Sequence, residues 1–254
     1  MLYKTAITRK PGHNIGDGNT TAKLGKPDYA KALQQHNAYA EALCACGLEV
    51  IVLEPDPLFP DGCFVEDTAV VTPQMAHITN PGAASRKGET EVISGILLRS
   101  KPLFRIKLPG TMDGGDVLRV EEKFFVGLSD RTNEEGIRQF QEFVRPFGYT
   151  VTPVPLDNLL HLKSGIAYIG NNTLIAVSDL AKREEFASLN VIEVERGEEY
   201  AANCIRIDTK KLIFPKGYPL IKERMRRLGY ETIELDMTEF QKMDGGLTCL
   251  SLLL

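Results

Sequence analysis

The chain has 254 residues, of which 43% are hydrophobic and 25% are charged, as in an ordinary globular protein with a sizeable core. Its net charge of −4 comes without the dense basic patches that bind a phosphate backbone, so nucleic acid is not expected as a partner. The sequence contains no apolar run of membrane-spanning length and no N-terminal signal peptide, which predicts a cytoplasmic protein without a membrane partner.

The cysteines and histidines predict neither a disulfide framework nor a metal site. The five cysteines are an odd number, and Cys44-Ala45-Cys46 lacks the Cys-x-x-Cys spacing. The four histidines form no metal-ligand cluster with the cysteines. Glycine-rich phosphate loops are also missing from the sequence, so nucleotide chemistry is unsupported.

The first predicted elements are a strand, a long polar loop and a helix. Residues from Lys4 to Thr8 alternate in polarity and predict a strand. The loop over residues 9–26 is rich in Gly, Asn, Asp and Thr, which is typical of a functional loop or a lid. From Pro27, apolar residues recur at steps of three and four, which predicts an amphipathic helix ending at Gly47.

The remaining chain repeats one theme, in which a pair of short strands precedes a helical segment. The hairpins begin near residues 65, 117, 166 and 204, at intervals of roughly 40 to 50 residues that are typical of repeat architectures. Thr132 and Glu135 predict a capping box before the second of these helices. The predicted pairs are Phe64–Val71 with Met75–Ile78, Val117–Val120 with Phe124–Gly127, Ile166–Ile169 with Thr173–Val177, and Cys204–Ile207 with Lys211–Phe214.

A fifth hairpin begins near Leu247 and is cut short by the C-terminus. The N-terminal strand is a suitable partner for this last segment, because both are apolar and otherwise unpaired. Five ββα-type units joined in this way would close into a ring with a central channel. An ordinary α+β sandwich is the alternative.

Four polar clusters occur where the predicted first strands begin, and in a ring such equivalent positions converge on the axis. Together they supply one thiol, one imidazole and several carboxylates, which suit covalent catalysis on a cationic substrate. The clusters are Glu66-Asp67, Asp113-Gly114-Gly115-Asp116, His161-Leu162-Lys163-Ser164 and Asp244-Gly245-Gly246-Leu247-Thr248-Cys249.

Cys249 is the candidate nucleophile, and a buried structural cysteine on a core strand is the alternative. A free thiol with a pKa of about 8.5 is mostly neutral at pH 7, so attack requires a cation beside the sulfur. The imidazolium of His161 or the substrate itself can supply that charge. A carboxylate should orient the imidazole, and the sequence leaves Asp113 and Asp116 as equal candidates.

As a set, these motifs resemble the dimethylarginine dimethylaminohydrolases, guanidino-group-modifying enzymes of the pentein fold. The resemblance covers nearly the whole chain. It includes Leu24-Gly25-Lys26-Pro27-Asp28-Tyr29, Phe64-Val65-Glu66-Asp67, Ser85-Arg86-Lys87-Gly88-Glu89-Thr90, Asp113-Gly114-Gly115-Asp116-Val117, Ser129-Asp130-Arg131-Thr132-Asn133, His161-Leu162-Lys163-Ser164, Ala202-Asn203-Cys204 and Asp244-Gly245-Gly246-Leu247-Thr248-Cys249.

The resemblance implies an α/β fold, a five-bladed α/β propeller in which ββαβ-type repeats surround a central channel. Residues 1–254 would form a single catalytic domain, with a homodimer as the expected assembly. Hydrolysis of Nω-methylated arginine to citrulline and a methylamine would proceed through a covalent thiouronium, without a metal or an organic cofactor. The alternatives are hydrolysis of free arginine to citrulline and ammonia, amidino transfer to an amine, and a non-catalytic binding protein on the same fold.

Roles for individual residues also follow from the resemblance. Cys249 is the implied nucleophile, His161 the general acid and base, and Asp113 the carboxylate that supports it. Lid Asn19 replaces an apolar leucine of the relatives, which favours a less methylated substrate. The other implied substrate contacts are Glu66 and Asp67 in the substrate pocket, with Asp67 near the guanidinium, Asp61 at the α-amino end, Arg86 and Arg131 at the carboxylate, and Met243 through its backbone.

Overall fold

The computed structural model describes residues 2–254, whose strands form five three-stranded sheets. In every sheet the first strand pairs antiparallel with the middle strand, and the third strand runs parallel to the middle one. A parallel partner requires a long crossover, and a helical segment occupies that crossover in each unit. This ββαβ arrangement confirms the predicted α/β repeat.

Four of the sheets are continuous in sequence, and one joins the two ends of the chain. The joined sheet has the order β15 (Ser251–Leu253), β1 (Thr5–Arg9) and β2 (Glu49–Leu53). The continuous sheets are β3 (Ala69–Val71), β4 (Ala76–Ile78) and β5 (Leu103–Arg105); β6 (Val117–Val120), β7 (Lys123–Leu128) and β8 (Thr150–Pro155); β9 (Ile166–Gly170), β10 (Thr173–Ala176) and β11 (Asn190–Glu193); and β12 (Ile205–Arg206), β13 (Lys211–Pro215) and β14 (Glu231–Leu235).

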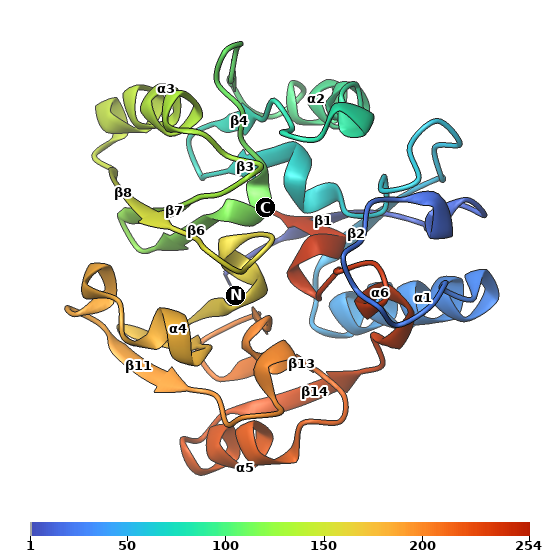
Figure 1. Ribbon diagram of the computed structural model, residues 1–254, viewed down its shortest axis with the longest axis vertical. Helices are drawn as coiled ribbons and strands as arrows, with labels where there is room; N and C mark the ends of the chain where they lie inside the picture. Colours follow the sequence, from blue (N-terminus) through green and yellow to red (C-terminus); the bar gives the residue numbers. More distant parts are fainter. Residues whose placement is uncertain (1) are drawn as a thin grey trace.

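The sheets are arranged in a ring, with the longer helices outside it and the C-terminus near its centre (Figure 1). No helix within residues 2–254 is long and apolar enough to cross a membrane. The helices are α1 (Tyr29–Ala45), α2 (Thr90–Leu97), α3 (Glu134–Val144), α4 (Ser178–Ala181), α5 (Pro219–Arg227) and α6 (Thr238–Gln241).

The hydrophobic core is divided into clusters that lie between neighbouring sheets. One cluster joins the terminal sheet to the β12–β14 sheet through residues such as Ala6 and Ile213. Another joins the terminal sheet to the β3–β5 sheet through Ile7 and Ala76. The other junctions have apolar clusters of the same kind. Burial of apolar surface at each junction stabilises the closed ring.

Closure depends on the last strand, as the sequence predicted. β15 pairs antiparallel with β1, with Ile7 opposite Leu252. The hydroxyl groups of Tyr39 and Ser251 lie 2.7 Å apart and connect helix α1 to this last strand. The end of the chain is therefore part of the core, and residue 249 lies where a sheet begins.

The structure corrects two predicted details. Asn133, and not Thr132, caps helix α3, because its side chain accepts a hydrogen bond from Gly136 N. The Thr132 hydroxyl instead donates to Asp116, so the predicted capping box was wrong. The strand predicted over Phe64–Val71 is shorter, because Val65–Thr68 form a 3₁₀ turn and only Ala69–Val71 pair with β4.

Short 3₁₀ turns precede the first strand of each sheet and carry the polar clusters. The turns at Val65–Thr68 and Gly114–Asp116 contact each other. The first of them also contacts the turn at Thr248–Leu250, and the second contacts Leu162–Ser164. Equivalent turns therefore bring side chains from distant parts of the sequence together at the axis of the ring.

Candidate active site

One cavity at the axis collects every site residue predicted from the sequence except Glu66. Phe64, Leu160, Asp244 and Gly245 also line it. The predicted residues in its wall are Asn19, Asp61, Asp67, Arg86, Asp113, Arg131, His161, Met243 and Cys249.

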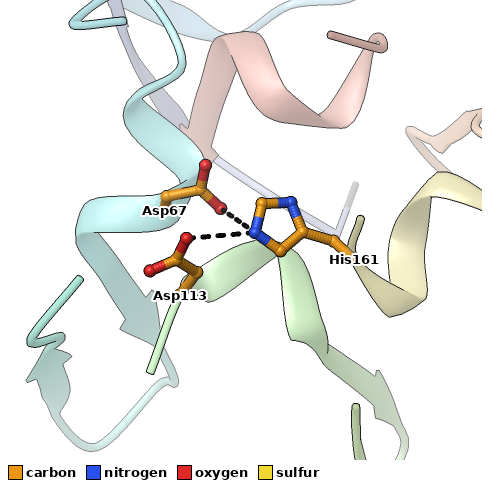
Figure 2. A group of neighbouring side chains, drawn as sticks. All are labelled: Asp67, Asp113 and His161. Carbon is orange, nitrogen blue, oxygen red and sulfur yellow. Dashed lines mark hydrogen bonds and ion pairs between the residues drawn. The ribbon is translucent and has the colours of Figure 1, made fainter. Parts of the chain in front are cut away.

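His161 lies at the start of its turn, and one of its ring nitrogens faces two buried carboxylates (Figure 2). Its Nε2 is 3.0 Å from Asp113 Oδ2 and 3.9 Å from Asp67 Oδ1. Burial lowers the pKa of His161, but the charge of Asp67 and the hydrogen bond to Asp113 outweigh it and raise this pKa to about 9. The imidazole is therefore protonated at neutral pH and can act as a general acid.

Asp113 and Asp116, which the sequence left as equal candidates, are in different places. Asp113 contacts the imidazole, whereas Asp116 Oδ1 accepts a hydrogen bond from the backbone N–H of Leu162 at 3.0 Å. The other oxygen of Asp116 accepts from Ser129 and Thr132. Asp116 thus fixes the backbone that follows His161, and burial raises its pKa.

Cys249 is partly buried in the turn that opens β15. The backbone N–H of Gly246 lies 3.3 Å from its Sγ and donates to it. Burial and the negative charges of Glu66 and Asp67 raise the pKa of the thiol to about 12. Without a ligand, Cys249 is therefore neutral at pH 7. A cation placed between the sulfur and these acids would lower its pKa.

Arg86 is almost fully buried and bonded within the protein. Its Nη1 donates to Asp67, and its Nε and Nη2 donate to both oxygens of Glu89. Nη2 also donates to the backbone carbonyl of Phe64 at 2.9 Å. The resemblance implied that Arg86 binds the substrate carboxylate, but here its planar fork holds Asp67 in place. Glu89 was not predicted as a site residue, because only the burial of Arg86 shows that a second carboxylate is required.

Arg131 differs from Arg86, because its guanidinium forms no hydrogen bond with a side chain or backbone group of residues 2–254. It lines the cavity and remains available to a carboxylate. The expected arginine pair therefore consists of one bound and one available guanidinium. The planar, always charged fork of Arg131 suits bidentate contact with a substrate carboxylate.

The loop over residues 9–26 covers the cavity, as the sequence predicted. The backbone N–H of Asn19 donates to the Asp61 carboxylate, and its side-chain Nδ2 donates to Asp61 Oδ2 at 2.6 Å and to Ser85 Oγ at 2.8 Å. On the other side of the loop, Thr20 and Thr21 donate to the Asp244 carboxylate. The loop is thus attached to both sides of the cavity. Asn19 is hydrogen-bonded to the Asp61 carboxylate, which is the group expected to bind the substrate α-amino group.

Glu66 does not line this cavity, although the resemblance places it in the substrate pocket together with Asp67. It lines a second cavity on the other side of the axis, together with Lys163 and Thr248. Glu66 Oε1 accepts from Lys163 Nζ at 2.6 Å, and Oε2 accepts from Thr248 Oγ1 at 2.8 Å. Neighbours in sequence face opposite cavities here, since Asp67 and Cys249 line the first one.

A metal ion is disfavoured at the point where Asp67, Asp113 and His161 meet. These residues offer one potential ligand atom each, within 4.8 Å of one another. Arg86 already neutralises Asp67, and a protonated His161 has no lone pair left for a metal. The arrangement binds protons and a positive side chain instead.

Comparison with known proteins gives one consistent result. Residues 19–249 match the family described as N,N dimethylarginine dimethylhydrolase, eukaryotic. The chain is 46% identical over 253 residues to the N(G),N(G)-dimethylarginine dimethylaminohydrolase of Pseudomonas aeruginosa, covering 99% of each chain. It is 35% identical to the enzyme of the same name from Streptomyces coelicolor, over 99% of this chain and 97% of the other.

The fold agrees with solved structures over the full length. A cysteine-to-serine variant of the Pseudomonas aeruginosa protein, complexed with citrulline, superposes with a TM-score of 0.97 at 44% identity and covers 100% of both chains. A histidine-to-glycine variant of dimethylarginine dimethylaminohydrolase, solved as an adduct with S-methyl-L-thiocitrulline, gives 0.96 at 45% identity with the same coverage. The chain belongs to the dimethylarginine dimethylaminohydrolase family.

Proposed function

We propose that this chain hydrolyses Nω-methylated arginine to citrulline and a methylamine through a covalent intermediate on Cys249. The observation that carries the proposal is the meeting of Cys249, His161 and Asp113 in one cavity whose other polar groups match a cationic amino acid. Family membership supports the same reaction, since the Pseudomonas aeruginosa relative was solved with citrulline. The cavity draws residues from both ends of the chain, which supports residues 1–254 acting as a single catalytic domain.

Substrate binding is proposed to use the charged groups of the cavity. Asp67 receives the guanidinium, and Arg131 receives the carboxylate at the other end of the substrate. The α-ammonium group of the substrate replaces Asn19 as the hydrogen-bond partner of the Asp61 carboxylate, and the backbone of Met243 provides a second contact. The bound guanidinium brings positive charge to the sulfur of Cys249 and so lowers the pKa of the thiol.

The first half of the reaction forms the intermediate. Cys249 loses its proton to solvent as the positive charge of the substrate arrives, and the thiolate attacks the guanidinium carbon, forming a C–S bond as the C=N π electrons move to nitrogen. His161, protonated at neutral pH, gives its proton to the methylated nitrogen, and the C–N bond breaks to release the amine. Asp113 stabilises the imidazolium and fixes its orientation through the 3.0 Å hydrogen bond. A thiouronium remains on Cys249.

The second half releases the product. His161, now neutral, takes a proton from water, and the oxygen attacks the thiouronium carbon. The C–S bond then breaks, the thiolate of Cys249 leaves, and the remaining protons are lost to give the ureido group of citrulline. The chain's own acid, base and nucleophile supply every step.

Hydrolysis of unmethylated arginine is the second candidate, and a polar lid favours it. Asn19 is the lid residue that contacts both Asp61 and Ser85, so an amide is presented where an apolar side chain would shelter methyl groups. The chemistry is the same, with ammonia as the leaving group. We also propose that the protein works in the cytoplasm. As the family resemblance implies, it is proposed to form a homodimer, which light scattering on the purified protein can test.

Cys249→Ser should reduce citrulline formation by at least about a thousandfold, because a hydroxyl is a far weaker nucleophile than a thiolate. The assay measures citrulline from dimethylarginine, monomethylarginine and arginine side by side. Cys44→Ser is the control, since Cys44 is exposed and should be dispensable. If wild-type protein made no citrulline from any of the three, the enzyme proposal would fail and a binding protein would be the better description. Full activity in Cys249→Ser would exclude it as the nucleophile.

Asn19→Leu should shift preference towards the methylated substrates. Burying one more methyl group contributes about 0.8 kcal/mol, which corresponds to about a fourfold change in the ratio of kcat/KM values for each methyl. Ser85→Ala is the matched control, because it removes the contact between Ser85 and Asn19 without adding apolar surface. An unchanged ratio in Asn19→Leu would show that the lid does not select the substrate.

The pH dependence of kcat/KM should show that His161 must be protonated for catalysis. Since its pKa is raised to about 9, kcat/KM should fall as the pH rises through about 9 and the general acid is lost. Asp113→Asn removes a group that raises this pKa, so the falling limb should move to lower pH. The substrate α-amino group also titrates in this range, but an enzyme variant cannot move its pKa. If kcat/KM fell at the same pH in wild type and in Asp113→Asn, the assignment of His161 as the general acid would be contradicted.

A further inference from the structure

One buried amide side chain connects the turn that carries the nucleophile to the turn that carries the acid and base. Asn203 is only 3% exposed and lies just before β12. Its Oδ1 accepts from the backbone N–H of Thr248 at 3.1 Å, and its Nδ2 donates to Thr248 Oγ1 at 3.0 Å. The same Nδ2 donates to the backbone carbonyl of Lys163 at 2.9 Å. All the main hydrogen-bonding capacity of the amide is used in these contacts.

The two turns joined by Asn203 carry the reacting groups. Thr248 directly precedes Cys249, and Lys163 is the second residue after His161. The amide therefore fixes the backbone on which each reacting side chain stands. Since these turns come from different sheets, with no covalent connection nearby, their spacing depends on such contacts.

The glycine pair before Cys249 makes room for this amide. A Cβ atom at Gly246 would lie 2.5 Å from Asn203 Cγ, closer than real Cβ contacts occur. The backbone N–H of Gly246 is also the donor to Cys249 Sγ. The contact with Asn203 thus fixes the position of Gly246, whose N–H donates to the sulfur.

Glu66 completes a closed circuit of hydrogen bonds. Thr248 Oγ1 accepts from Asn203 and donates to Glu66, so its orientation is fixed. Glu66 also accepts from the side chain of Lys163, whose carbonyl accepts from Asn203. Glu66, Lys163 and Thr248 of this circuit line the second cavity. Asn203 lines neither cavity, so its side chain is not placed to touch a substrate.

We propose that Asn203 is a positioning residue for the hydrolysis, which sets the distance between Cys249 and the His161 turn. The inference rests on the proposed function. Misplacement of a reacting group by about 1 Å can cost about a hundredfold in rate, whereas substrate contacts made elsewhere are unaffected. A defect in Asn203 should therefore lower kcat and leave KM nearly unchanged.

The test compares Asn203→Ala with wild type in the dimethylarginine assay. We expect kcat to fall about a hundredfold and KM to change less than about threefold. Thr248→Val removes the hydroxyl but keeps the backbone contact with Asn203, so an intermediate loss is expected, and Thr248→Ser should restore activity. Gln139→Ala is the matched control, because that amide also holds one residue, Lys107, through its N–H and carbonyl groups, but far from the cavity. Its kcat should equal that of wild type.

Alkylation of Cys249 by iodoacetamide, followed by mass spectrometry, gives a readout that needs no turnover. Loosening the turn exposes the sulfur to water and lowers its raised pKa, so Asn203→Ala should be alkylated faster than wild type at pH 8 although it turns over more slowly. If wild type produced no citrulline, the proposed function would fail. The alkylation rates would still test whether Asn203 fixes the turn that carries Cys249. A wild-type kcat, a wild-type alkylation rate, or a rise in KM alone in Asn203→Ala would each overturn the proposal. Should Asn203→Ala not fold, Thr248→Val decides by the same criteria.

Discussion

The buried charges around His161 depend on one another. The carboxylates of Asp67 and Asp113 are buried beside the imidazole of His161, and the guanidinium of Arg86 also pairs with Asp67. The acids also keep His161 protonated, through the rise in its pKa to about 9. With Glu89, which pairs with Arg86, the cluster holds three carboxylates and two cations, so a positively charged head group would complete it. The same excess of negative charge keeps the Cys249 thiol neutral until such a group arrives. Recognition of the substrate and activation of the nucleophile therefore have one electrostatic cause.

The ring of sheets brings the charged and reactive side chains of the site together at its axis. Each sheet begins with a short turn at the axis, and equivalent turns carry Asp67, Asp113, His161 and Cys249. Because the last strand pairs with the first, a residue five positions before the final one can lie at the centre of the molecule. The lid adds the remaining control, since Asn19 and the Asp244 carboxylate attach it to both sides of the cavity. Binding and catalysis thus use loops that the closed sheets hold rigidly.

Much of the fold was predictable because short-range patterns determine it. Alternating apolar residues predicted the hairpins, and the unpaired apolar ends predicted that the chain closes on itself. The third strands were not located, since segments such as Glu231–Leu235 are short and carry charged residues. The capping box failed because Thr132 takes a distant partner, Asp116, which no local pattern reveals. Tertiary contacts override local preference at such positions.

The site was predictable in its residues more than in its contacts. Family motifs identified Cys249 and His161, but adjacent Glu66 and Asp67 face opposite cavities, and sequence alone does not say which face is which. Likewise, only the structure shows that Arg86 is bound within the protein while Arg131 is available. These differences arise from burial, because a buried charge must find its partner inside the protein.

The most direct measurement of the central claim is an acid quench of the enzyme during turnover of dimethylarginine, followed by peptide mass spectrometry. The account predicts a transient adduct on the peptide that contains Cys249, with the mass of the substrate less dimethylamine. Its amount should rise and decay at rates consistent with kcat. Citrulline formation at full rate with no adduct on Cys249 at any time, or an adduct on another residue, would contradict the account.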